Sequence, residues 1–192
     1  SPSIALPASS FIELKNISGN PVQLRNWEIS NGSTTAVIKK DYLLAAAGFL
    51  ILCPSSAEDA YRNFGPALGI TGFPSLNNDA GVIILMAEGG RVIHAVQYDK
   101  SWYRNELKAG GGWSLEMIDP GNPCSGSSNW TASNQATGGT PGKQNSVNAE
   151  NPDLSGPDLL RSITPDSLHL IALFSEPLDS STAADVLHYT LS

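Results

Sequence analysis

The stretch that decides the fold is VQLRNWEISNGSTTAVIKK, residues 22–40. Two runs of β-favouring residues, VQLRNWEIS and TAVIKK, lie on either side of the pair Asn31-Gly32. Asn and Gly readily adopt the positive φ angles of tight turns, so this pair between two such runs is a strong hairpin signal. The stretch therefore predicts two antiparallel strands.

The same pattern recurs on both sides of this hairpin. FIELKN (11–16) precedes it, and GFLILC (48–53) follows as a continuous apolar run, typical of a strand buried on both faces. VIILMA (82–87), a Glu-Gly-Gly turn and RVIHAVQYD (91–99) predict a second hairpin, and WSLEMI (113–118) predicts a further strand. We expect an all-β fold, most simply a β-sandwich.

One short helix is expected in PSSAEDAYRNFG, residues 54–65. Ser55 and Ser56 are candidate N-caps, acidic residues follow them, and Gly65 suits a left-handed C-terminal position.

Composition divides the chain into three parts. Residues 1–148 carry the strand pattern of one domain. From Thr137 the composition changes to Gly, Pro, Asn and Ser, and residues 149–158 are expected to form a linker. SLHLIALF (167–174) is a strong strand in the remaining segment, 159–192, which is too short to bury a sandwich core. We expect that segment to be the truncated start of a second β module.

Charge and hydropathy exclude two classes of function. The 192 residues carry a net charge of −7 without a basic cluster, which disfavours binding to a nucleic-acid backbone. The sequence has no apolar run of about 18 residues, so no helix is expected to insert into a membrane. Any export signal is expected to precede Ser1.

The two cysteines, Cys53 and Cys124, leave two interpretations open. They lack the companions of a zinc site and are either free thiols or a disulfide. A disulfide would close a loop of 71 residues (124 − 53) and contribute about 4 kcal/mol in an oxidising compartment. We expect the disulfide, since Cys124 lies in a Gly/Ser/Pro loop where a free thiol would be exposed.

No catalytic or metal site is expected. The three histidines, His94, His169 and His188, occur without a known hydrolase motif, and His94 alternates with apolar residues along a strand. The run Asn77 to Asp79 lacks the spacing of a calcium loop and fits a turn. Four carboxylates are the candidates for a catalytic pair but more often face solvent on strands: Glu13, Glu28, Glu116 and Asp119.

The tryptophans are the candidate binding residues. Trp27 and Trp113 are expected in strands of the core, and Trp130 is expected to fold back and fix the loop before it. Trp102 and Tyr103 lie among charged residues between strands, where they would contact a sugar or a partner protein, or pack over one end of the sandwich.

Several short motifs occur together in one order: FIELKN, the Trp27 strand, GFLILC, PSLNNDAGVIIL, RVIHAVQYD followed by SW, GGWSLEMIDP, NWTAS and GGTPGKQNS. In these motifs residues 1–148 resemble the bacterial lamin tail domain. The resemblance implies an Ig-like β-sandwich without catalytic activity, found in secreted or surface-anchored bacterial proteins beside other Ig-like modules or hydrolases. The likeness departs in two places, because the usual first strand is missing and His94 stands where many relatives have Asp. FSEPLDSSTAADVLHYTLS, at the end of the chain, is similar to the start of a bacterial Ig-like domain.

The resemblance implies a non-catalytic interaction, spacer or targeting module of a secreted, periplasmic or cell-surface protein, whose partner is a protein or a surface glycan. One alternative is a carbohydrate-binding module that uses Trp102 and Tyr103, and a second is a nucleic-acid-associated domain, against which the acidic charge argues. If the first strand is missing, SLHLIALF could fill the vacant sheet edge within one chain or in a strand-exchange dimer.

Overall fold

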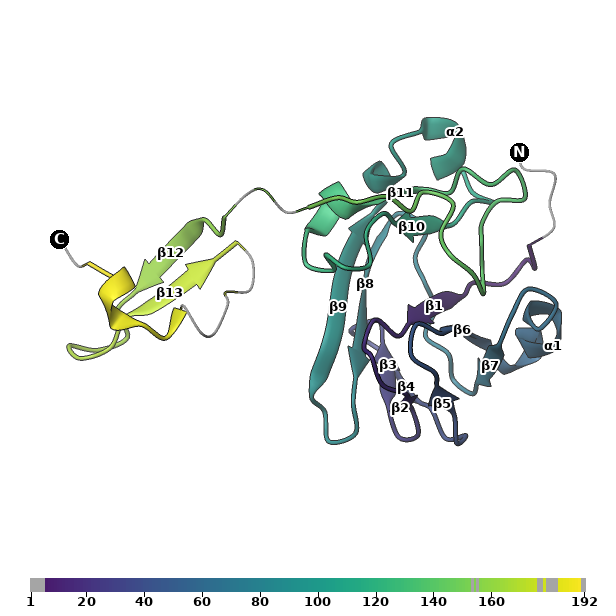
Figure 1. Cartoon of the computed structure of the whole chain (residues 1–192), viewed down its shortest axis with the longest axis horizontal. Helices are drawn as coiled ribbons and strands as arrows, with labels where there is room; N and C mark the ends of the chain where they lie inside the picture. The colour runs from purple at the N-terminus through teal and green to yellow at the C-terminus, as the bar shows by residue number, and fades with distance from the viewer. Residues whose placement is uncertain (1–5, 153, 155, 176–177, 179–182, 191–192) are drawn as a thin grey trace. The chain divides into compact units, whose positions relative to one another are not determined.

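Strands make up most of the regular structure, which confirms the prediction of a mainly β chain. The computed structural model describes residues 6–152, 154, 156–175, 178 and 183–190. The chain divides into two compact units, Ser1–Asn151 and Pro152–Ser192. Figure 1 shows their elements. Within the described residues, no helix is long and apolar enough to cross a membrane.

The first sheet of unit 1 has the order β1-β6-β7. β1 (Ile12–Lys15) is antiparallel to β6 (Phe49–Pro54), and β6 is parallel to β7 (Ala67–Ile70). Parallel neighbours need a crossover, which here runs through the short helical segment after β6. That segment is the 3₁₀ turn η1 (Ser55–Ala57) followed by α1 (Glu58–Tyr61).

The helix is present, but its expected ends differ. No side chain caps η1 or α1: the Ser55 hydroxyl lies 3.4 Å from that of Thr71 instead. Gly65 lacks a left-handed conformation, and its lack of a side chain serves close backbone packing against Gly142.

The second sheet has the order β4-β3-β8-β9 and contains both expected hairpins. β3 (Glu28–Ser30) pairs with β4 (Thr35–Val37), and β8 (Ala80–Met86) pairs with β9 (Val92–Asp99). The first connection spans four residues, because the Asn31 side chain accepts hydrogen bonds from the N–H groups of Ser33 and Thr34. The Asn31 N–H also donates to the Thr34 carbonyl at 3.1 Å, so the turn itself consists of Gly32, at φ +86°, and Ser33.

Two shorter pairs complete unit 1. β2 (Val22–Gln23) pairs with β5 (Leu43–Leu44), and β10 (Leu115–Met117) pairs with β11 (Trp130–Ala132). Between β9 and β10 the chain forms the 3₁₀ turn η2 (Lys100–Tyr103) and α2 (Glu106–Ala109), which the sequence pattern did not predict. The 3₁₀ turn η3 (Gly126–Asn129) leads into β11.

The two larger sheets share one hydrophobic core. Ile29 of β3 and Leu50 and Leu52 of β6 are fully buried in it. Ile51 and Cys53 point to the other face of β6, where they pack with Tyr61 of α1. β6 is therefore buried on both faces, as its continuous apolar run predicted.

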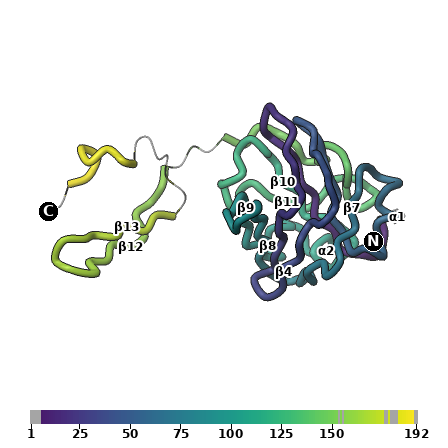
Figure 2. Tube along the Cα trace, turned by 90° about the horizontal axis from the view of Figure 1, so that it is seen from below, coloured from purple at the N-terminus to yellow at the C-terminus, as the bar shows by residue number. Residues whose placement is uncertain are grey.

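Unit 2 is a two-stranded hairpin followed by the 3₁₀ turn η4 (Val186–His188) (Figure 2). β12 (Leu159–Ile163) pairs with β13 (Ile171–Phe174). The strand expected over residues 167–174 is thus shorter, and it pairs with β12. Residues 149–151, expected in the linker, belong to unit 1.

Candidate functional site

A glycine-rich segment, TGGTPGKQNS (residues 137–146), binds the carboxylates of two different strands; we call it the glycine loop. The start of the glycine loop lies beside the residue before β10, where the Ser114 N–H donates to the Gly138 carbonyl at 2.7 Å. At Gly138 (φ +98°) a side chain would collide with the Gly112 carbonyl. Gly142 (φ +80°) lies against the backbone of Phe64 and Gly65, where an added Cβ would meet the Phe64 carbonyl oxygen at 2.7 Å. The glycines therefore permit contacts that other residues would block.

Glu116 of β10 holds the middle of the glycine loop. Its side chain is buried, with 4% of the residue exposed. One carboxylate oxygen accepts from the N–H and hydroxyl of Thr140, at 3.1 and 2.7 Å, and from the Ser114 hydroxyl. The other accepts from the N–H and hydroxyl of Ser146, at 2.9 and 2.8 Å. A buried carboxylate is tolerated only when its oxygens are bonded in this way.

Glu13 of β1 binds the same loop from the first sheet. Its carboxylate accepts a short hydrogen bond from the Gly142 N–H. Burial raises the pKa of Glu13 to about 7; the Gly142 bond opposes this rise, and the negative charge of Glu116 adds to it. The structure thus brings together Glu13 and Glu116, two of the four carboxylates considered as a catalytic pair.

Two neighbouring carboxyl groups are also an arrangement that acid–base enzymes use. Here both groups bond to the glycine loop of the same chain. A surface cavity of about 360 Å³ lies elsewhere, between Lys15, Ile17 and Asp119, and neither Glu13 nor Glu116 lines it. The geometry of the pair therefore fits the fastening of a loop better than the binding of a substrate.

The irregular 119–129 loop is fixed by Asn129 at its end. Asn129 is fully buried. Its amide nitrogen donates to the carbonyls of Asp119 and Asn122, at 2.8 and 2.7 Å, and its amide oxygen accepts from the Asp119 N–H at 2.8 Å. The loop has no neighbouring strand to bond its backbone groups, and the Asn129 side chain supplies those hydrogen bonds instead.

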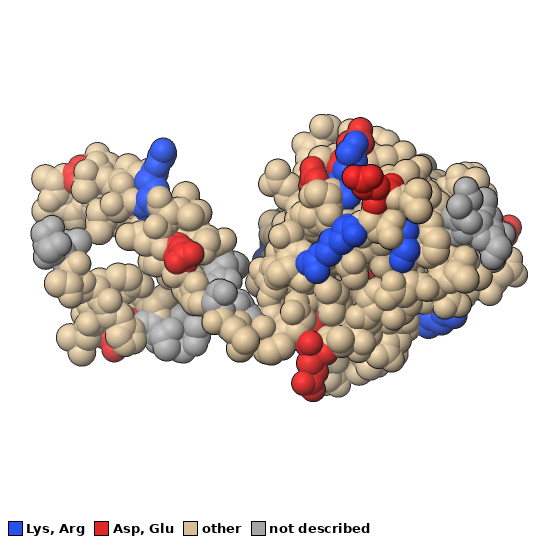
Figure 3. All heavy atoms as spheres, turned by 90° about the horizontal axis from the view of Figure 1, so that it is seen from above, with Lys and Arg blue, Asp and Glu red and all other residues tan. Residues whose placement is uncertain are grey.

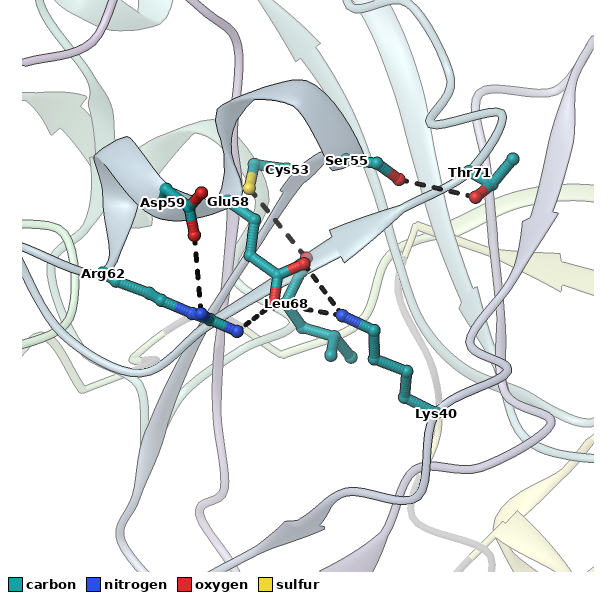
Figure 4. A network of polar contacts seen from close by, with 8 residues as sticks. All are labelled: Lys40, Cys53, Ser55, Glu58, Asp59, Arg62, Leu68 and Thr71. Carbon is teal, nitrogen blue, oxygen red and sulfur yellow. Dashed lines mark hydrogen bonds and ion pairs between the residues drawn. The ribbon is translucent and has the colours of Figure 1, made fainter.

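The expected disulfide is not formed, because Cys53 and Cys124 are both free. Cys53 is buried beside α1, where its sulfur lies 3.9 Å from the Leu68 carbonyl oxygen (Figure 4). Cys124 is exposed in the 119–129 loop. The loop needs no covalent tie, since the buried Asn129 amide already holds it.

Asp119 fixes the end of unit 1. Its carboxylate accepts from the N–H groups of Gly121 and Asn151, and these bonds, that of Asn151 first, lower the pKa of Asp119. The Ala149 N–H donates to the Ile118 carbonyl at 3.1 Å. These contacts are the reason why residues 149–151 belong to unit 1.

The candidate ligand pair, Trp102 and Tyr103, lies in η2 and is half-buried. The Trp102 ring packs against that of Trp130, with centroids 6.4 Å apart and planes inclined by 35°. The Tyr103 hydroxyl donates to the Trp113 carbonyl at 3.2 Å. Of the two roles considered, packing over one end of unit 1 is therefore the one the structure displays; ligand contact remains a proposal.

The other tryptophans are less buried than expected. Trp27 precedes β3 and packs at the margin of the core, half-exposed. Trp113 lies before β10, with the Lys108 ammonium 4.6 Å from its ring centroid. Trp130 does lie at the end of the 119–129 loop, where it supports Trp102 as well as the loop.

The remaining candidate residues are scattered. His94 is half-buried on β9, its Nε2 has no hydrogen-bond partner, and burial lowers its pKa. Asn77 and Asp79 form a turn before β8, and Asp79 pairs with Lys100 at 2.7 Å. Among the described residues, no group of three or more His, Cys, Asp or Glu side chains is placed to hold a metal ion.

Sequence reasoning missed Asn129, Thr140 and Ser146 as key residues. A Glu between apolar strand residues, Glu116, was the available signal, because a buried carboxylate requires donors from elsewhere in the chain.

No family model matches this chain, and no curated protein is significantly similar to it.

Proposed function

We propose that the chain is a non-catalytic interaction, spacer or targeting module of a secreted or cell-surface bacterial protein. In this proposal, residues 1–148 form an Ig-like β-sandwich of the lamin tail type. The observation that carries it is the bonding of the glycine loop: Glu13 and Glu116, the acidic pair best placed for chemistry, bind Gly142, Thr140 and Ser146 of the scaffold. The shared core of the two sheets supports the sandwich.

The exposed apolar residues of the hairpin in unit 2 support the proposal that the parent protein consists of several modules. Leu159, Ile171 and Leu173 are each more than half exposed, although strands usually bury such residues. An isolated two-stranded hairpin has too little buried surface to be stable alone. We therefore assign unit 2 to the beginning of a second Ig-like module whose other strands cover these residues.

The non-catalytic assignment is tested by separating activity from stability. Glu116→Gln should lower the unfolding temperature, because an amide cannot accept all the hydrogen bonds that the carboxylate accepts. Wild type and variant should both lack turnover on ester, glycoside and phosphoester substrates. Hydrolysis by the wild type that Glu116→Gln abolishes, at a temperature where both proteins are folded, would overturn the proposal.

A carbohydrate-binding module is the second candidate. Trp102 and Trp130 are half-exposed rings inclined at 35°, and such rings can stack on sugar faces. Binding to a broad glycan array, lost in Trp102→Ala/Tyr103→Ala but retained in Trp27→Phe, would support this candidate. Equal binding by both variants would place the ligand elsewhere.

Nucleic-acid association is the least supported alternative. On the face drawn in Figure 3, the Lys and Arg side chains of unit 1 stand among Asp and Glu side chains rather than in one basic patch. Binding to phosphates needs a concentration of positive charge. The net charge of −7 also opposes it.

A further inference from the structure

The pair Asn31-Gly32 is chemically reactive as well as turn-forming, and it is the one Asn-Gly pair in the sequence. The backbone nitrogen after an asparagine can attack the side-chain carbonyl carbon, and a following glycine leaves this nitrogen unhindered because it has no side chain. In that reaction the bond from the Gly32 nitrogen to Asn31 Cγ forms and the bond from Cγ to Nδ2 breaks. Nδ2 leaves as ammonia and takes up, through water, the proton that the Gly32 nitrogen loses. Water then opens the resulting succinimide ring to aspartate or isoaspartate.

The side chain of Asn31 is held in place while the hairpin is closed. Its Oδ1 accepts from the N–H groups of Ser33 and Thr34, at 3.0 and 2.7 Å. Its Nδ2 donates to the Ser75 carbonyl at 2.9 Å. Turning this amide toward the next backbone nitrogen breaks these bonds, so the folded turn opposes the reaction.

The backbone around the pair is held as well. The Asn31 N–H donates to the Thr34 carbonyl at 3.1 Å, and the Gly32 N–H donates to the Ser30 hydroxyl at 3.1 Å. A succinimide ring brings the Gly32 nitrogen alongside Cβ of Asn31, whereas the extended backbone of a strand keeps the two apart. Ring closure therefore rotates the chain where it leaves β3, and the pairing of β3 with β4 has to open first.

β4 is the element whose detachment releases the pair. It has three residues and lies at the edge of its sheet, where β3 is its one strand partner among the described residues. Thr35 and Val37 are exposed, and Ala36 and Ile38 anchor the segment in the core. Short edge segments of this kind open at a lower free energy than the whole domain.

The two products of the reaction differ in their fit to the hairpin. Aspartate at position 31 keeps the oxygen that accepts from Ser33 and Thr34, and loses only the donor to the Ser75 carbonyl. Isoaspartate directs the main chain through the side-chain carbonyl, which adds a methylene group to the backbone. The register between β3 and β4 is then lost, because each strand residue must keep its side of the sheet.

We propose that Asn31 is a self-modification site gated by the β3–β4 hairpin: the closed hairpin preserves the asparagine, and detachment of β4 permits succinimide formation. Isoaspartate formed in the open state prevents the hairpin from closing again. The reactants are the chain itself and water, and the inference is independent of the function proposed above.

The test is the rate of deamidation at Asn31 in the full chain at mildly alkaline pH, followed by peptide mapping with mass spectrometry. The native chain should react at least about a hundredfold more slowly than the chain in guanidinium chloride, because the reaction waits for a rare opening. Equal rates in the two conditions would overturn the proposal.

Two matched substitutions locate the gate. Ile38→Val weakens the anchor of β4 and should raise the native rate about two- to tenfold. Ile51→Val removes the same methylene from β6, at a position that is also fully buried, and should leave the native rate unchanged. Neither variant should differ from the wild type in guanidinium chloride. Equal acceleration by both would make unfolding of the whole unit the gate and would overturn the proposal, as would no acceleration by Ile38→Val.

Refolding tests the effect of the product. Chains that have reacted in guanidinium chloride are refolded, and the native and unfolded fractions are separated by size-exclusion chromatography. Isoaspartate at position 31 should be confined to the unfolded fraction, and aspartate should occur in the native one. An equal share of isoaspartate in both fractions would refute the block on closure.

Discussion

Single buried polar side chains organise the irregular parts of unit 1. Glu116 and Asn129 are nearly or fully buried, and their oxygen and nitrogen atoms have hydrogen-bond partners on other segments. Burial makes each bond costly to lose, since no water can replace it. Long loops are therefore held in one conformation without regular structure.

Glu13 makes the stability of the chain depend on pH. Its pKa is about 7 in the folded chain, against an ordinary value of 4.5 for an exposed glutamate, so the folded state binds the proton more tightly. The corresponding stability is fully present below pH 4.5 and is lost as pH rises through 7. Between pH 5 and 8 the wild type should lose about 1–3 kcal/mol more in unfolding free energy than Glu13→Gln, measured by urea denaturation. The exposed control Asp41→Asn should behave as the wild type; the same pH dependence in Glu13→Gln would contradict the assignment.

Substitution of Asn129 should release the 119–129 loop. Asn129→Ala leaves the carbonyls of Asp119 and Asn122 and the N–H of Asp119 without this partner. We expect a loss of about 2–4 kcal/mol in unfolding free energy. Asn63→Ala, which removes an exposed amide with weak contacts at 3.2 and 3.4 Å, is the control and should cost less than about 0.5 kcal/mol. Equal losses in the two variants would refute the role given to Asn129.

The two thiols should react at very different rates. Cys124 is exposed, whereas Cys53 is fully buried and burial raises its pKa. A maleimide should label Cys124 within minutes in the native protein and Cys53 only through unfolding. Two thiols should be counted under denaturing, non-reducing conditions, and a count of zero would show that the disulfide forms after all.

At the scale of elements, the glycine loop binds strands that are distant in sequence. It bonds to β10 through Glu116 and to β1 through Glu13, and its Gly142 packs on the chain that follows α1. Both β1 and β10 are short, with four and three residues. Their positions therefore depend on the loop as well as on their own ladders.

Gly142 should tolerate substitution less well than a glycine of similar backbone conformation. Gly142→Ala imposes a positive φ of 80° and a contact of 2.7 Å with the Phe64 carbonyl. Gly72→Ala imposes a φ of 73° with no atom within 4 Å, and so isolates the cost of the backbone angle. We expect about 1 kcal/mol for Gly72→Ala and at least about 3 kcal/mol for Gly142→Ala, by thermal or chemical denaturation. Similar losses of unfolding free energy in the two variants would show that the backbone of the glycine loop shifts to accommodate the added methyl group.

Local patterns predicted the strands and missed the links between them. The Asn31-Gly32 signal and the continuous run of β6 gave the hairpin and the buried strand, since both depend on neighbouring residues. The bonds from Glu13 to Gly142 and from Glu116 to Thr140 join residues 129 and 24 positions apart. No local periodicity carries that information, so the bonds of the glycine loop were not predicted. The disulfide between Cys53 and Cys124 was wrongly expected, because the Gly/Ser/Pro loop around Cys124 gives no sign of the Asn129 side chain that holds it. The candidate site was therefore predicted as residues, without its geometry.

At the scale of the whole molecule, the two units differ in how much they bury. β6 in unit 1 has four fully buried residues, whereas every residue of β12 is exposed. Regular secondary structure is therefore not equivalent to stability in this chain, because hairpins without a covered face are marginal.

Hydrogen exchange should separate the two units. Amides of β6 should exchange only through global unfolding, and those of β12 and β13 should exchange at least about a thousandfold faster. β1 is the internal control, because its ladder with β6 has four residue pairs, as many as the ladder between β12 and β13. The amides of β1 should exchange as slowly as those of β6. Equal protection of β12 and β6 would mean that the apolar residues of unit 2 are covered in solution.

The bond between Glu13 and Gly142 also has a consequence for synthesis on the ribosome. Its two residues are 129 positions apart, so at about 5–20 residues per second β1 waits on the order of ten seconds for the glycine loop to emerge. During that interval Glu13 lies in water, ionised, and its strand lacks the segment that later covers it. A nascent chain arrested before Gly142 should thus be a better chaperone client than one arrested some tens of residues after it, once the loop has left the exit tunnel.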